Sequence, residues 1–103
     1  MSFAIDLRAK VFEDLDKIHA WYEKRAPGLG DRFAAAFFAS LPILKRNPTV
    51  FAPYYRDVRH CLLKRFPYGI YFRIEGENVV VVRVFHCSRN QSKLRKSLRD
   101  FLP

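Results

Sequence analysis

Four consecutive valines, Val79–Val82, limit most strongly what this chain can fold into. Successive residues of a strand point to opposite faces of its sheet, so this run is apolar on both faces. A strand that is apolar on both faces is typical of the interior of a sheet rather than of its edge. We therefore interpret Val79–His86 as a central strand.

The length of the chain, 103 residues, supports one core, and we expect 1–103 to form a single domain. A hydrophobic content of 50% is too high for a disordered polycation. No apolar run approaches the roughly 18–20 residues that span a bilayer. Asp6 and Arg8 stand where a secretory signal would hold its apolar stretch. We therefore expect a cytoplasmic protein with no membrane partner.

The hydrophobic period changes along the chain. Residues 2–8 alternate as in a short strand, and from Ala9 the apolar residues recur at helical spacing as far as the Ala-Pro-Gly segment at 26–28. A second helix is predicted over Leu29–Arg46, with a kink at Pro42. Asn47-Pro48 ends it.

Two further strands, Val58–Arg65 and Tyr68–Glu75, are predicted before the central one, with 49–57 as a connection. Leu94 and Leu98 lie at helical spacing in a short terminal helix that we expect to pack only weakly. The order β-α-α-β-β-β predicts an α+β fold in which a helical hairpin covers one face of an antiparallel sheet.

The net charge is +9, and residues 52–103 carry most of it, with 11 Lys and Arg against 4 Asp and Glu. Such a surplus on a folded domain indicates an anionic partner. Arg beside aromatic side chains suits the stacking of bases and the pairing of phosphates, or an acidic peptide laid across the sheet. A solvated face without a ligand is the other interpretation. The expected binding residues are Arg59, Lys64, Arg65, Tyr71, Arg73, Arg83, Phe85 and Arg89.

Few residues offer catalytic chemistry. The sequence has no P-loop, dinucleotide fingerprint or nucleophile elbow. Its two cysteines and three histidines are too scattered to predict a metal site, and we expect no cofactor. If the chain is a nuclease, His86 would move a proton, and Arg83 and Arg89 would bind phosphate or stabilise the anionic transition state. Otherwise His86 ends the strand and forms local hydrogen bonds.

Several segments, in this order, resemble the RelE/ParE superfamily of bacterial toxins. They are Asp14–Ile18, Trp21–Glu23, Pro27–Gly30, Asn47-Pro48, Val58-Arg59, Lys64–Phe72 and Val84–Arg89. No single segment is specific, but the ordered set is, and it covers nearly the whole chain. The resemblance implies the toxin of a type II toxin–antitoxin pair, wrapped and neutralised by a small acidic antitoxin. Operator DNA would then be bound only through the antitoxin complex.

Two activities divide this superfamily. RelE-like members cleave mRNA on the ribosome with sheet Arg and Lys residues and a late Tyr or His, whereas ParE-like members poison DNA gyrase and are not nucleases. Here Gly69 follows Tyr68 where the nuclease pattern has Arg, no Tyr follows Tyr71 and no His follows His86. These departures favour a non-enzymatic, ParE-like inhibitor of gyrase. A RelE-like mRNA endonuclease and a degenerate, non-toxic member are the alternatives.

Overall fold

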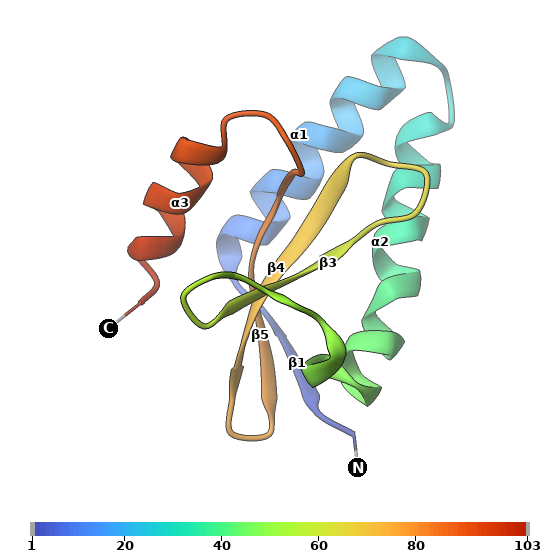
Figure 1. The fold of residues 1–103 in the computed structure, drawn as a ribbon. Coiled ribbons are helices and arrows are strands. Elements are labelled where there is room, and N and C mark those ends of the chain that lie inside the picture. Colours follow the sequence, from blue (N-terminus) through green and yellow to red (C-terminus); the bar gives the residue numbers. More distant parts are fainter. Residues whose placement is uncertain (1, 103) are drawn as a thin grey trace.

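The computed structural model describes residues 2–102, in which helices cover both faces of one sheet (Figure 1). The elements, in order, are β1 (Ala4–Leu7), α1 (Ala9–Arg25), α2 (Leu29–Arg46), a 3-10 turn η1 (Pro48–Val50), β2 (Pro53–Tyr55), β3 (Val58–Leu62), β4 (Tyr68–Glu75), β5 (Asn78–His86) and α3 (Gln91–Arg99). The predicted α+β class, the bounds of α2 and the helical hairpin are confirmed. Within the described residues, no helix is long and apolar enough to cross a membrane.

The sheet has five strands in the order β1-β5-β4-β3-β2. The predicted central position of β5 is confirmed, because it lies between β1 and β4, and its four valines are buried on both faces. The expectation of an antiparallel sheet is wrong in one respect, because β1 pairs parallel with β5. The short edge strand β2 also lies where only a connection was expected, and its first residue, Pro53, suits an edge because proline cannot donate to a ladder. Both differences arise from pairing between distant segments, which a local pattern does not specify.

The hairpin of α1 and α2 covers one face of the sheet. Its buried residues, which include Val11, Phe33 and Phe37, form one cluster with Val79 and Val81. This cluster is the main core, and it contains the side of β5 that faces the hairpin.

The opposite face is covered by α3 (Figure 1). Leu94 and Leu98 are fully buried against Val80 and Val82, together with Tyr71. The expectation that the terminal helix packs weakly is therefore wrong. The physical reason is the second apolar face of β5, which must be removed from water and which the hairpin does not reach.

A β-bulge alters the last part of β5. Tyr71 pairs with Arg83, whereas the next residue, Phe72, pairs with Val81, so Val82 is the extra residue. Val82 packs in the α3 cluster and Val84 in the hairpin cluster. Bulges typically change the direction of a side chain, and Arg83 here contacts residues of both α1 and α3.

The tip of the hairpin is closed by polar contacts. The Glu23 carboxylate accepts hydrogen bonds from the backbone N–H groups of Gly28 (3.1 Å) and Gly30 (2.8 Å), close to the start of α2. His19 Nε2 lies 2.8 Å from Asp31 Oδ1. A Cβ on Gly30 would lie 2.6 Å from the backbone oxygen of His19, so only glycine permits this approach of the two helices.

The contact between His19 and Asp31 predicts a pH dependence of stability. The hydrogen bond that His19 donates to the Asp31 carboxylate raises the pKa of His19 above its usual value of 6.5. The contact therefore stabilises the fold fully below about pH 6.5, and this contribution disappears as the pH rises through the folded-state pKa. We expect His19→Gln to remove this pH-dependent contribution to stability. Urea unfolding of both proteins at pH values below and above the pKa of His19 would measure the difference. An unchanged pH profile in His19→Gln would contradict this prediction.

Candidate functional site

A groove lies where β5 ends and the chain turns toward α3. Its volume is about 330 Å³. It is lined from α1 by Asp14, Lys17, Ile18 and Trp21, from β4 by Tyr68, from β5 by Arg83, Val84, Phe85 and His86, and from the following segment by Arg89, Asn90 and Lys93. We call this the α1–α3 groove. It brings together cationic and aromatic side chains that are far apart in the sequence.

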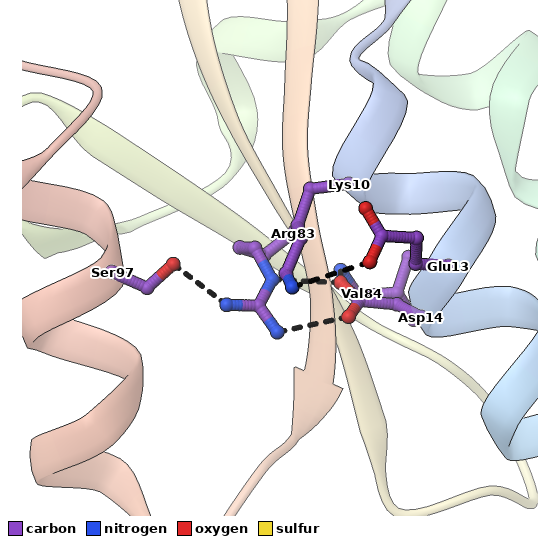
Figure 2. Close-up of polar contacts among 6 residues, drawn as sticks. All are labelled: Lys10, Glu13, Asp14, Arg83, Val84 and Ser97. Carbon is purple, nitrogen blue, oxygen red and sulfur yellow. Dashed lines mark hydrogen bonds and ion pairs between the residues drawn. The ribbon is translucent and has the colours of Figure 1, made fainter.

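One wall of the α1–α3 groove is a buried ion pair (Figure 2). Arg83 donates from Nε to Asp14 Oδ2 and from Nη2 to Asp14 Oδ1, both at 2.8 Å. Its third nitrogen, Nη1, donates to Ser97 Oγ at 2.6 Å. The side chains of Arg83 and Asp14 are only 7% and 8% exposed. The two-point geometry is the strongest form of an arginine–carboxylate contact, and here it links α1, β5 and α3.

The place of Asp14 follows from the length of β1. The last pairing between β1 and β5 joins Leu7 to Val81, so β5 continues beyond its partner strand. The backbone N–H of Val84 donates instead to Asp14 Oδ2 at 3.0 Å. A buried N–H group needs a partner, and the carboxylate of α1 supplies it where the neighbouring strand has ended.

His86 is held in one tautomer by the turn that follows it. Its Nδ1 accepts hydrogen bonds from the backbone N–H groups of Ser88 (3.0 Å) and Arg89 (3.1 Å). The ring proton of the neutral side chain therefore lies on Nε2. Burial, and then the charge of Arg89, lower the pKa of His86. At neutral pH this imidazole is thus a hydrogen-bond donor through Nε2 and a poor proton acceptor.

Three cations of the groove have no carboxylate partner within residues 2–102. Lys17, Arg89 and Lys93 are exposed and take part in none of the ion pairs of this part of the chain. Asp14 is the one acidic residue that lines the groove, and Arg83 already neutralises it. The α1–α3 groove therefore carries a net positive charge and suits an anionic ligand.

The structure brings four of the sequence-predicted residues into this groove, namely Arg83, Phe85, His86 and Arg89. Lys64 and Arg65 line a different groove beside α2, together with Arg32 and Phe66. Arg59 and Arg73 lie outside both grooves. The predicted set is thus divided between separate places in the fold.

Several residues that were expected to bind a partner instead bind other parts of this chain or are buried. Arg59 donates to the carbonyl oxygens of Thr49 and Phe51, and Arg73 pairs with Asp57 at 3.1 Å. The expectation that Arg83 and Tyr71 are free for a partner is wrong here, because Arg83 is only 6% exposed and Tyr71 is fully buried. The reason is α3, which covers the sheet face that was expected to be open. Burial also raises the pKa of Tyr71 to about 12, which makes its hydroxyl a poor acid.

Four cationic or aromatic residues of the groove were not among the predicted site residues. They are Lys17, Trp21, Tyr68 and Lys93. The spacing of Lys17 and Trp21, i and i+4 on α1, places both on one side of the helix and was the available signal. Lys17 nevertheless belongs to the less basic half of the chain, so the distribution of charge did not indicate it as a binding residue.

His19, Glu23 and Asp31, at the hairpin tip, are the one group of three in the described residues whose potential metal-ligating atoms lie within 4.8 Å of one another. Their proximity is explained by the hydrogen bonds that close the hairpin. These residues lie outside the α1–α3 groove.

A helical hairpin and a third helix lie on opposite faces of a five-stranded mixed sheet, and this α+β arrangement matches the fold of solved RelE/ParE toxin structures. Residues 5–91 match the family described as the ParE toxin of the type II toxin–antitoxin system parDE, and the chain belongs to this family. The resemblance predicted from the sequence is thereby confirmed. A comparison with curated proteins gave no match.

Solved structures share the fold. The chromosomal ParDE toxin–antitoxin system from P. aeruginosa matches with a TM-score of 0.74 and 20% identity, over 82% of this chain and 96% of that one. The toxin–antitoxin complex RelBE2 from Mycobacterium tuberculosis gives 0.62 and 24%, over 84% and 99%. A mutant of the E. coli toxin RelE in the free state gives 0.68 and 11%, over 99% and 100%.

The buried ion pair predicts a large loss of stability when it is broken from one side. We expect Asp14→Ala to lower the free energy of unfolding by about 3–5 kcal/mol, because Arg83 is then buried without a counter-charge and Val84 loses its acceptor. The double variant Asp14→Ala/Arg83→Met should lose much less than the sum of the two single variants. Urea unfolding of the four proteins measures the coupling, and additive losses would contradict the prediction.

Proposed function

We propose that this type II toxin acts by binding and inhibiting DNA gyrase, and that a small acidic antitoxin neutralises it. One observation carries the proposal, namely that the α1–α3 groove offers positive charge without a free acid–base pair. Asp14 is committed to Arg83, and His86 uses its Nδ1 as an acceptor for the following turn. Such a groove can bind an anionic surface but has little means to move protons.

The family supports this target. The matched family is the ParE toxin of the type II system parDE. The resemblance seen in the sequence implies that ParE-like members poison gyrase rather than cleave RNA. A binding protein that acts on gyrase needs a surface complementary to a protein–DNA complex, and exposed cations at Lys17, Arg89 and Lys93 fit that need.

An antitoxin partner is supported by two observations. The structures of similar fold include ParDE and RelBE2 toxin–antitoxin systems. The net charge of +9 also suits a partner of opposite charge, which would speed association and favour the correct complex. Both the antitoxin and gyrase would be met in the cytoplasm.

A ribosome-dependent mRNA endonuclease is the second candidate. One observation favours it, because His86 and Arg89 line the same groove. Of the three candidate catalytic residues, however, Arg83 is buried in its ion pair and His86 is a poor proton acceptor. Neither residue is thus placed as cleavage of a phosphodiester requires.

A gyrase assay tests the proposal. Purified toxin should inhibit supercoiling of a relaxed plasmid by gyrase, or trap cleaved DNA, and its antitoxin should reverse the effect. Arg89 is a groove cation without an ion-pair partner in residues 2–102. Arg89→Gln should therefore weaken inhibition by about tenfold, the effect of losing one ion pair of roughly 1.4 kcal/mol with gyrase. Arg95→Gln, which removes the same charge from an exposed position of α3 outside the groove, is the matched control.

No effect on gyrase at excess toxin would overturn the proposal. Primer extension on translated mRNA after induction should then decide between the other interpretations. Cuts at fixed codon positions that disappear in His86→Ala would show an endonuclease, whereas unaffected growth and intact mRNA would show a member that is not toxic.

A further inference from the structure

The α1–α3 groove holds more positive charge than the fold requires. Lys17 comes from α1, Arg89 from the turn after β5 and Lys93 from the first turn of α3. Like charges gathered in one concave site repel each other, and none of the three has a carboxylate partner within the described residues. Lys93 also lies at the positive end of the dipole of α3, where a cation is unfavourable. An anion in the groove would relieve both costs.

Aromatic rings stand beside these cations. Trp21 is 39% exposed, and Tyr68 and Phe85 are partly buried, so each offers some ring surface to the groove. The guanidinium of Arg25 covers Trp21 with its carbon 3.4 Å from the ring centroid, which fixes the indole. Cations that follow a backbone and rings that accept bases are the two components of sites for single-stranded nucleic acid.

We propose that the α1–α3 groove binds single-stranded DNA, with a phosphate among Lys17, Arg89 and Lys93 and a neighbouring base against Trp21. The Nε2–H of His86 supplies a further donor to the phosphate. This DNA site rests on the proposed function and extends it, because the toxin would then contact DNA directly as well as gyrase. A volume of about 330 Å³ is at the small end of ligand sites and suits one nucleotide at a time.

An acidic peptide fits this groove less well. Peptides that bind along a sheet do so by adding a strand to a free edge. The edge of β5 is closed here, since Asp14 already accepts the N–H of Val84. Carboxylates would gain from the cations but nothing from the aromatic rings, whereas a base gains from stacking.

The single tryptophan of the chain makes the groove directly observable. Purified toxin is titrated with a five-residue oligothymidylate while the fluorescence of Trp21 is followed. We expect a saturable change in fluorescence and an affinity that falls as the salt concentration rises. A plot of the logarithm of the association constant against the logarithm of the salt concentration should have a slope of about −0.7 for each phosphate contacted. Lys17→Gln/Lys93→Gln should weaken binding by about tenfold and bring that slope closer to zero, since both lysines contact the one proposed phosphate.

The matched control is Lys45→Gln/Lys96→Gln, which removes the same charge from exposed helix positions outside the groove. It should bind as the unmodified toxin does, and unfolding curves of all variants establish that each is folded. Equal weakening by both double variants would overturn the proposal, since it would mean that only net charge matters. A response of Trp21 to a polyglutamate peptide but not to the oligonucleotide would also overturn it.

The two proposals fail in different ways. Oligonucleotide binding with no inhibition of gyrase would overturn the proposed target and leave the DNA site intact. Inhibition of gyrase with no response of Trp21 to the oligonucleotide would overturn the DNA site and leave the target intact.

Discussion

The contact between Asp14 and Arg83 determines how the two faces of this molecule are joined. The hairpin and α3 lie on opposite sides of the sheet, and this pair connects them around the edge of β5, with Ser97 as the third member. A buried ion pair stabilises little unless its hydrogen bonds are complete. Here they are supplied by the Val84 N–H and by the two-point contact of the guanidinium. The pair therefore contributes most by fixing where α3 lies, and hence where Lys93 stands relative to α1.

Elements with a strong local pattern could be predicted from the sequence. The change of hydrophobic period placed the hairpin, and the four valines of β5 indicated a strand in the interior of the sheet. The parallel pairing of β1, the edge strand β2 and the firm packing of α3 were not predicted. Each depends on segments far apart in the chain, and α3 contributes only Leu94 and Leu98 as buried anchors.

The candidate site was only partly predictable, for an electrostatic reason. A sequence shows which residues are charged but not which of them find a partner. Asp14 and Arg83 are 69 residues apart, and only the fold reveals that they neutralise each other. Arg59 and Arg73 are likewise used within the structure. Lys17 belongs to the less basic half of the chain, yet it is among the cations without a partner in the described residues.

Some charged groups of the groove are bound within the fold, and others have no partner in the described residues. This difference bears on what the toxin can do. Catalysis of phosphodiester cleavage needs a group that exchanges a proton at the right place. In the α1–α3 groove the carboxylate is held by an arginine and the imidazole by the backbone of a turn, so both are committed to the fold. The groups of the groove without an ion-pair partner in the described residues are two lysines and an arginine, and aromatic rings lie beside them. The groove thus offers positive charge and ring surface, while Asp14 and His86 are held by contacts within the fold.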